Sequence, residues 1–353
     1  MSKNILKHRL QDSRITGVGS ALIDFLIHET DDFLVKLGKQ KGGMTLVSDS
    51  DIEAILKKIA EQNRDNKPVV VPGGATCNTI IGVGKLGGEA CFIGKRGNDY
   101  YGDFYEDNLK KSNVYPLFHT SATPTGKVLS IITPDAQRSM FTCLGASTEL
   151  EPESITPEMF NNTGIALMEG YLLFNPDLMM ACLKSAKGAD SMIALDLARF
   201  EVVEASRDIL NDIVNEYVDI LIANEDEARA YTGFSDELTA LEALGENVII
   251  AVLKVGERGS YISYKNSAAN SVTDINLDKG TSKVIRVYAK SREAVKDTTG
   301  AGDLWAAGFL YGIANGYSIE KSGEIASACG YEVCQVVGAQ IPEHGWQRIR
   351  SLL

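Results

Sequence analysis

The sequence VKDTTGAGDLWAAGFLYGIANG, residues 295–316, joins a glycine-rich turn that carries one carboxylate to a long apolar helical pattern. Gly300, Ala301 and Gly302 have little or no side chain, so their backbone N–H groups can approach a charged ligand. The helix that follows adds unpaired N–H groups and the positive end of its dipole, a combination that binds phosphate. Asp303 stands at this opening, where a carboxylate suits a general base that accepts a proton from an attacking hydroxyl. The position also suits a helix cap, and spacing alone leaves both roles open.

The run DTTGAGD at residues 297–303, followed by AGF at 307–309, resembles the C-terminal signature of the PfkB/ribokinase family of carbohydrate and nucleoside kinases. The resemblance implies that Asp303 is the catalytic base and that the amides of residues 300–302 form the anion hole. Family members often bind potassium near this hole, and Asp297 matches one of the usual ligands.

Composition describes an ordinary globular protein of 353 residues, 44% hydrophobic and 23% charged. The formal net charge of -12 argues against sequence-independent binding of nucleic acid, which needs a basic surface. No apolar run reaches the roughly 18 residues of a membrane span, and the N-terminus MSKNILKHRLQDSR lacks an apolar signal core, so we expect a cytoplasmic protein. The six cysteines include no Cys-x-x-Cys pair, which indicates reduced thiols, and the four histidines lack metal-ligand spacing.

Residues 15–29 predict two apolar strands separated by a break of small residues. Asp24 lies in the second strand, where a carboxylate is costly unless it neutralises a partner or binds ligand hydroxyls. Further along, Gly73 and Gly74 precede a helix with Asn78, whose amide can donate to and accept from vicinal hydroxyls. By resemblance to the same family, these four residues hold the sugar of the acceptor.

The segment between these two motifs, residues 31–67, predicts two helices, the second of them capped by Asp49 or Ser50. Ribokinases and fructokinases usually connect the two motifs more briefly. The longer connection resembles the layout of adenosine kinases.

The stretch GVGKLG at residues 82–87 fits the pattern GxGxxG, and Asp103 follows about twenty residues later, as in a dinucleotide-binding motif. These glycines lie inside a predicted helix and not in a turn after a strand, so we expect close helix packing there and no dinucleotide. Asp99 and Gly102 match a recurring Gly-x-Asp…Gly segment of the resembled family, and we expect a structural role for them.

Two alternating strands on either side of Pro134-Asp135 predict a β-hairpin. In the resembled kinases such a hairpin belongs to a small β lid, which excludes water from the transfer. Here the lid would form from parts of 15–50 and 120–146, and its edges could pair in a homodimer. Arg138 either reaches the substrate or a phosphate, or is a solvated charge of the hairpin.

From residue 165 onward, apolar strands alternate with helices, which predicts a parallel sheet. In such sheets the ligand lies beyond the carboxyl ends of the strands. Four predicted strands end in polar residues that would converge on one crevice: Glu169, Asp196, Asn224 and Lys254.

Asn224 and Glu227 resemble the family's Asn-x-x-Glu motif, which organises magnesium, water and phosphate. The alternative is an N-cap followed by a surface glutamate. Lys254, Gly256 and Gly259 resemble the turn beside the nucleotide in that family, where Lys254 could meet a phosphate.

The sequence therefore predicts a ribokinase-like α/β fold, a mostly parallel sheet flanked by helices with a small β-sheet lid, in one domain over residues 1–353. The expected activity is transfer of the γ-phosphoryl group of ATP, bound with Mg²⁺, to the primary hydroxyl of a ribose-containing substrate. The long 31–67 segment and Pro124-Thr125-Gly126 favour adenosine. The alternatives are a sugar kinase, such as a ribokinase or fructokinase, and a catalytically silent nucleoside-binding protein.

Overall fold

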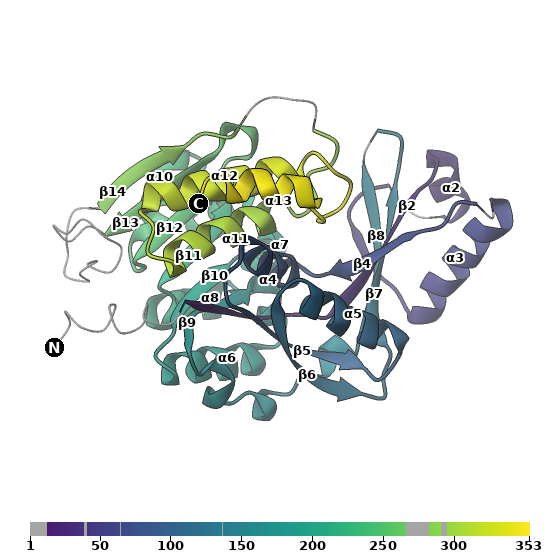
Figure 1. Cartoon of the computed structure of the whole chain (residues 1–353), viewed down its shortest axis with the longest axis horizontal. Coiled ribbons are helices and arrows are strands. Elements are labelled where there is room, and N and C mark those ends of the chain that lie inside the picture. Colours follow the sequence, from purple (N-terminus) through teal and green to yellow (C-terminus); the bar gives the residue numbers. More distant parts are fainter. Residues whose placement is uncertain (1–12, 39–40, 64, 136, 266–281, 291–294) are drawn as a thin grey trace.

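The computed structural model describes residues 13–38, 41–63, 65–135, 137–265, 282–290 and 295–353. Most of the N-terminal segment in which no signal core was found lies outside these residues. Two sheets organise the chain (Figure 1). The large sheet and its helices occupy most of the length of the molecule, and the small sheet lies with α2 and α3 at one end.

The large sheet has nine strands in the order β14-β13-β12-β11-β10-β9-β1-β5-β6. Neighbours from β12 to β6 are parallel, and β13 and β14 add an antiparallel edge. The central strands are apolar throughout because helices cover both faces. The strands are β1 (Arg14–Val18), β5 (Ala90–Gly97), β6 (Val114–Ser121), β9 (Thr163–Glu169), β10 (Met192–Asp196), β11 (Ile220–Asn224), β12 (Ile250–Lys254), β13 (Ser260–Lys265) and β14 (Ser282–Val287).

Alternate residues of the central strands enter two separate apolar clusters. Ile165 and Leu167 pack with the helices of one face, and Ala166 and Met168 with those of the other. The first face is covered by α4 (Ala75–Leu86), α5 (Tyr100–Lys111), α11 (Ala301–Ala314), α12 (Ile319–Val333) and α13 (Glu343–Arg350). The second is covered by α6 (Pro176–Gly188), α7 (Phe200–Ala205), α8 (Arg207–Tyr217), α9 (Glu225–Thr232) and α10 (Glu237–Gly245). Short 3-10 turns occupy Ala146–Glu149, Pro152–Ser154, Pro157–Phe160, Gly170–Phe174 and Gly256–Arg258.

The small sheet has the order β3-β8-β7-β2-β4. Its strands are β2 (Leu22–His28), β3 (Met44–Leu46), β4 (Val69–Gly73), β7 (Thr125–Ile132) and β8 (Arg138–Gly145), and its helices are α2 (Asp31–Lys36) and α3 (Asp49–Gln62). The sheet thus includes β4, which lies outside the two ranges expected from sequence, and β2 pairs with β7 in parallel. Ile23, Phe25 and Ile27 join the apolar cluster that contains α2 and α3, so Asp24 and Leu26 point to the opposite face.

Two local predictions can be compared with the structure. The cap of α3 is Ser48, in a capping box with Asp51, and not Asp49 or Ser50. The glycines of the GxGxxG match lie in helix α4 and at its end, as expected. A Cβ on Gly82 would come within 2.6 Å of the Ala307 Cβ, so this glycine allows α4 and α11 to pack closely. Among the described residues, no helix has the length and apolarity needed to cross a membrane.

Candidate active site

The predicted strand ends meet the start of α11 at the carboxyl edge of the large sheet. Strands β9 to β12 end at Glu169, Asp196, Asn224 and Lys254, as the sequence predicts. The Lys254 Nζ lies 2.9 Å from Asp196 Oδ2. The same Nζ is 3.3 Å from the place a Cβ on Gly302 would occupy, so the ammonium group borders the glycine-rich turn.

Helix α11 begins without a side-chain cap. Its N-cap is Gly300, at φ 71°, and a Cβ there would come within 2.6 Å of the Ala339 Cβ. The Ala301 N–H donates to the Thr298 carbonyl at 3.1 Å, which removes one of the three amides predicted for the anion hole. The N–H groups of Gly302 and Asp303 have no acceptor among the described residues. Two uncapped donors therefore stand at the positive end of the helix.

The Asp303 carboxylate does not cap α11 but faces helix α4. Its Oδ2 accepts a hydrogen bond from Asn78 Nδ2 at 2.9 Å, and its backbone carbonyl accepts one from Thr79 Oγ1 at 3.1 Å. Enclosure by protein raises the pKa of Asp303 to about 7, while the Asn78 hydrogen bond lowers it and the charge of Asp196 raises it. A carboxyl group with this pKa can hold or release a proton near neutral pH.

Asp24 reaches the same region from the small sheet. Its carboxyl group lies against Gly73, where a Cβ would be 2.3 Å from the carboxyl carbon, so only glycine fits. Burial raises the pKa of Asp24 to about 7, and the positive charge of Arg138 lowers it. The charges of Asp24, Glu169 and Asp303 all raise the pKa of the Cys77 thiol, which is next to Asn78. These three carboxyl groups therefore lie around the start of α4.

One further polar group at this point lacks a partner among the described residues, and one glycine fixes the turn beside it. The Oδ1 of Asn78 is buried and accepts no hydrogen bond, although its Nδ2 is used by Asp303. Gly74 takes φ 97° at the N-cap of α4, and a Cβ there would come within 2.7 Å of the Ser20 carbonyl oxygen. The predicted substrate residues Asp24, Gly73 and Asn78 thus lie together, and Gly74 shapes the turn that joins them.

Arg138 is not a solvated charge of the hairpin. Its side chain is 14% exposed, and its Nη2 lies 3.7 Å from Asp297 Oδ2. The Nε and Nη2 atoms are buried without a hydrogen-bond partner. Asp297 itself accepts hydrogen bonds from the Thr299 N–H and hydroxyl and from the Gly338 N–H. A potassium ion would have to compete with this guanidinium, so these residues fit a monovalent cation poorly.

Asn224 and Glu227 form a capping box at the start of α9. Glu227 is 2% exposed, so the alternative of a cap followed by a surface glutamate is wrong in its second half. Burial raises the pKa of Glu227 to about 7; the charge of Lys254 lowers it and that of Asp196 raises it. Because the Glu227 oxygens accept from the Asn224 backbone and side chain, any contact of this pair with a metal would run through Asn224 and water.

The turn after Lys254 holds the two remaining predicted residues. Gly256 and Gly259 take φ 57° and 97°, values that favour glycine. A Cβ on Gly259 would come within 2.0 Å of the Val287 carbonyl oxygen, so this turn packs against the end of β14. No contact in the described part of the chain joins either glycine to Asp303.

Sequence reasoning gave no role to several groups that the structure brings here. Glu169 Oε2 accepts from the Thr76 N–H at 3.1 Å and from its hydroxyl at 2.7 Å, and burial raises the pKa of Glu169. Burial likewise raises the pKa of Tyr171 to about 12, and the charges of Glu169 and Asp303 contribute to this rise. The only sequence signal was the polar residue that ends each strand.

The crevice holds more carboxyl groups than cations. The charge of Asp196 raises the pKa of both Glu227 and Asp303, and the charges of all three carboxyl groups raise the pKa of the Lys254 ammonium. This surplus of negative charge favours a divalent cation that arrives with an anionic ligand. Among the described residues, no cluster of three or more His, Cys, Asp or Glu side chains is arranged to hold a metal ion by itself.

Comparison with known proteins identifies the family. Residues 44–345 match the family described as "pfkB family carbohydrate kinase". The nucleoside kinase of Methanocaldococcus jannaschii is 26% identical over 280 residues, which cover 78% of this chain and 83% of that protein. The solved structure of the adenosine kinase from Sinorhizobium meliloti is 28% identical with a TM-score of 0.80, over 97% of this chain and 100% of that chain. A probable sugar kinase from Rhizobium etli is 27% identical with a TM-score of 0.81, over 96% and 99%. Because the family match spans most of its length, the chain belongs to the pfkB family of carbohydrate kinases.

Proposed function

We propose that this protein transfers the γ-phosphoryl group of ATP to the primary hydroxyl of a ribose-containing substrate, most favourably adenosine. Family membership makes it an ATP-dependent kinase that phosphorylates an alcohol group of a sugar or nucleoside. The observation that carries the finer proposal is the position of Asp303. This carboxyl group, with a pKa near 7, lies between the hydroxyl-binding side chains of Asp24 and Asn78 and the free amides of α11.

The proposed reaction uses Asp303 as the general base. Asp24 and the free Asn78 Oδ1 accept hydrogen bonds from the acceptor's secondary hydroxyls and orient it. Asp303 takes the proton of the primary hydroxyl as that oxygen bonds to the γ-phosphorus and the bond to the ADP oxygen breaks. The N–H groups of Gly302 and Asp303 stabilise the charge on the transferring group. The products are ADP and the phosphate ester, and Asp303 releases its proton to solvent.

The nucleotide lies on the other side of the turn. Lys254 borders Gly302, so its ammonium can meet a phosphate oxygen. Magnesium bound with ATP would neutralise charge on the phosphates, and Asn224 with Glu227 would hold its water ligands. Gly256 and Gly259 would line the turn beside the nucleotide. The small sheet, from which Asp24 and Arg138 project, would act as the lid that excludes water.

Adenosine is favoured by two features. The long segment between β2 and β4 forms α2, β3 and α3 of the small sheet, the layout that resembles adenosine kinases. An aromatic side chain also lies nearby, because the charge of Asp303 contributes to the raised pKa of Tyr171. Such a ring could stack on a base, which a free sugar lacks. The sugar-kinase alternative has support from the likeness to the Rhizobium etli protein, whose TM-score is similar.

The test is ADP production from ATP and Mg²⁺ with adenosine, inosine, ribose and fructose offered separately, and mass analysis of each product. We expect fast turnover with adenosine and formation of a 5′-phosphate ester. Turnover with a free sugar alone would indicate that the protein is a sugar kinase and not an adenosine kinase. A lack of turnover with all four would favour a silent nucleoside-binding protein.

A homodimer through the small sheet remains a prediction. Its edge strands β3 and β4 expose Leu46 and Val69, at 63% and 61%. Exposed apolar edges of this kind can pair with a second copy. Sedimentation of the wild type and of a Val69→Lys variant would decide whether the edge is used.

A further inference from the structure

Four chain crossings join the small sheet to the large one, and all lie in the described residues. Three of them contain glycines: Gly19 between β1 and β2, Gly73 at the end of β4 with Gly74 after it, and Gly145 at the end of β8. The fourth, from β6 to β7 over residues 121–125, contains no glycine. Glycines allow backbone rotation that other residues resist, so the fourth crossing differs in kind from the others.

The fourth crossing is fixed by Asp99. The Thr125 N–H donates to Asp99 Oδ2 at 2.7 Å, and the Thr125 hydroxyl donates to Asp99 Oδ1 at 2.7 Å. The same hydroxyl accepts a hydrogen bond from the Gly97 N–H at 3.0 Å. Thr125 is 1% exposed. Burial alone would raise the pKa of Asp99, but these hydrogen bonds and one from the Gly102 N–H lower it, so the carboxylate is ionised.

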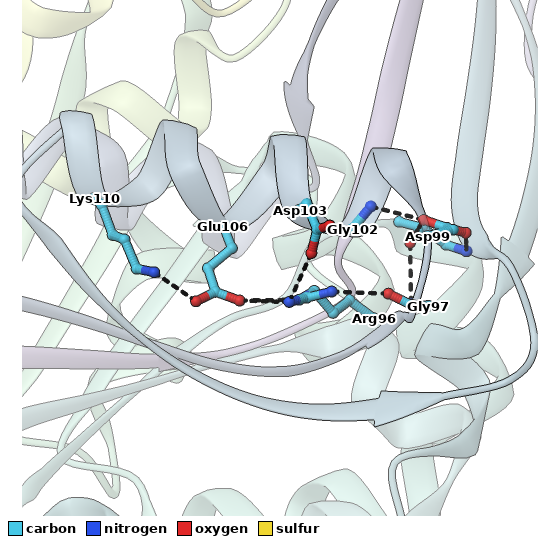
Figure 2. A network of polar contacts seen from close by, with 8 residues as sticks. Arg96, Gly97, Asp99, Gly102, Asp103, Glu106 and Lys110 are labelled. Atoms are coloured by element: carbon cyan, nitrogen blue, oxygen red, sulfur yellow. Dashed lines mark hydrogen bonds and ion pairs between the residues drawn. The ribbon is translucent and has the colours of Figure 1, made fainter.

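Asp99 is itself held by the large sheet and α5, as Figure 2 shows. It is the N-cap of α5 and accepts from the Gly102 N–H at 2.7 Å. Arg96, at the end of β5, donates to Glu106 on α5 and to the Gly97 carbonyl. A Cβ on Gly102 would come within 2.2 Å of the Gly97 oxygen. The carboxylate therefore sits on a rigid support formed by β5 and α5.

The crossing is held at a second point by Glu149, whose carboxylate accepts hydrogen bonds from the Ser121 and Thr123 hydroxyls. The far end of the hairpin is bonded to its neighbours around the small sheet, where Lys41 Nζ lies 2.7 Å from Asp135 Oδ2 and the Gly42 N–H donates to Ser139 Oγ at 2.8 Å. Its Arg138 makes the 3.7 Å approach to Asp297, with two buried nitrogen atoms unpaired. The β7–β8 hairpin is thus hydrogen-bonded to Asp99 at its root, whereas its tip is bonded around the small sheet and approaches Asp297 through Arg138.

We propose that the Asp99–Thr125 pair is the pivot of the small sheet, and that it positions Asp24 beside Gly73 and Arg138 beside Asp297 in the active site. Strand pairing links Thr125 to Asp24: β7, which begins at Thr125, pairs with β2, and Val128 lies opposite Asp24. At the other end of the hairpin, Ile132 pairs with Arg138. The three crossings with glycines allow the small sheet to rotate relative to the large sheet. Asp99 fixes the axis of that rotation. This inference rests on the proposed function only where it gives the small sheet the role of a lid.

The test compares Thr125→Val and Asp99→Asn with two matched controls in the full chain. Thr125→Ser keeps the hydroxyl, and Asp103→Asn removes only the exposed contact of Asp103 with Arg96, at 3.1 Å. Kinetics are measured with whichever acceptor the wild type uses, together with ATP hydrolysis in its absence. Hydrogen–deuterium exchange follows peptides of β7 and β8 against peptides of β9 to β12.

The loss of a hydrogen bond to a charged group changes an equilibrium constant by about tenfold or more. We expect the acceptor KM to rise about tenfold in Thr125→Val and Asp99→Asn, with the ATP KM unchanged, more hydrolysis of ATP by water, and faster exchange confined to β7 and β8. Both controls should behave as the wild type. Exchange in β7 and β8 that equals that of the wild type would overturn the proposal, as would a uniform loss of stability with an unchanged acceptor KM. If the wild type phosphorylates no acceptor, the proposed function fails, and the exchange data alone decide the pivot.

Discussion

Replacing Asp303 by asparagine should lower the activity of the enzyme and raise its stability at pH 8. The asparagine oxygen can still accept the hydrogen bond from Asn78 Nδ2, so the local structure should persist. The variant loses the carboxylate that we propose accepts the proton of the acceptor hydroxyl. General base catalysis contributes about a hundred- to ten-thousandfold, and we expect kcat to fall by that range with the KM values nearly unchanged.

The stability effect follows from the cost of burying a charge. The pKa of Asp303 is raised from 3.8 to about 7, which corresponds to about 4 kcal/mol against the ionised folded form. Because the side chain is partly accessible in the crevice, we expect about 2 kcal/mol. The neutral form is favoured in the folded state, so the penalty is absent below pH 4, grows between pH 4 and pH 7, and is complete above pH 7. The variant should therefore be more stable than the wild type at pH 8 and equal to it near pH 4.

The assay pairs steady-state ADP production with urea unfolding at pH 8 and pH 5, and Asp103→Asn, an exposed carboxylate, serves as the control. The control should change neither measurement. Full phosphotransfer by Asp303→Asn would refute the base assignment. Equal stability of variant and wild type at pH 8 would refute the reasoning from burial.

Three further changes probe the rest of the site and its support. Asp24→Asn should raise the acceptor KM by about tenfold or more and leave the ATP KM unchanged. It should also increase the stability at pH 8, because burial raises the pKa of Asp24 to about 7. An unchanged acceptor KM would exclude a contact between Asp24 and the acceptor. Lys254→Met should move the acid limb of the pH–rate profile to higher pH, since the ammonium lowers the pKa of Asp303, and Lys254→Arg should leave that limb near the wild-type position. Gly82→Ala should destabilise the protein by about 1–3 kcal/mol in thermal or urea unfolding, because its Cβ would overlap α11. Gly330→Ala in α12, where the added Cβ would meet α11 only at ordinary contact distances, should instead be neutral or slightly stabilising.

The parts of the fold that follow from local pattern could be predicted. Strands β9 to β12 are continuous apolar runs that stop at one polar residue each, and a buried parallel strand must end where its backbone reaches solvent. The amide site of α11 could be predicted only in part: the Gly302 N–H is free as expected, but the Ala301 N–H is bonded to Thr298, and the free Asp303 N–H was not among the three expected. Each of these inferences uses neighbours in sequence.

Contacts between distant segments could not be predicted. Asn78 and Asp303 are 225 positions apart, and no property of either residue announces the 2.9 Å hydrogen bond between them. The burial of Glu227 depends on the packing of α9, since a capping box has the same sequence whether its glutamate is exposed or enclosed. The Ser48 cap was missed because three candidate polar residues stand in a row, and only backbone geometry selects one.

The unpaired groups of the crevice divide it into two halves of opposite polarity. On the side of the small sheet and α4, Asn78 Oδ1 is a buried acceptor with no donor among the described residues, and the Asp24 carboxyl group is a second acceptor. Both suit a ligand that brings hydroxyl groups. On the side of α11, the Gly302 amide and the Lys254 ammonium are donors that suit a ligand that brings negative charge. Asp303 lies on the border, with its carboxylate toward the first half and its amide in the second. Folding alone gains nothing from acceptors and donors kept apart in this way, because each would be more stable if paired. In the proposed function an alcohol and a phosphate occupy the two halves, which makes the arrangement favourable, and their reacting atoms meet at Asp303.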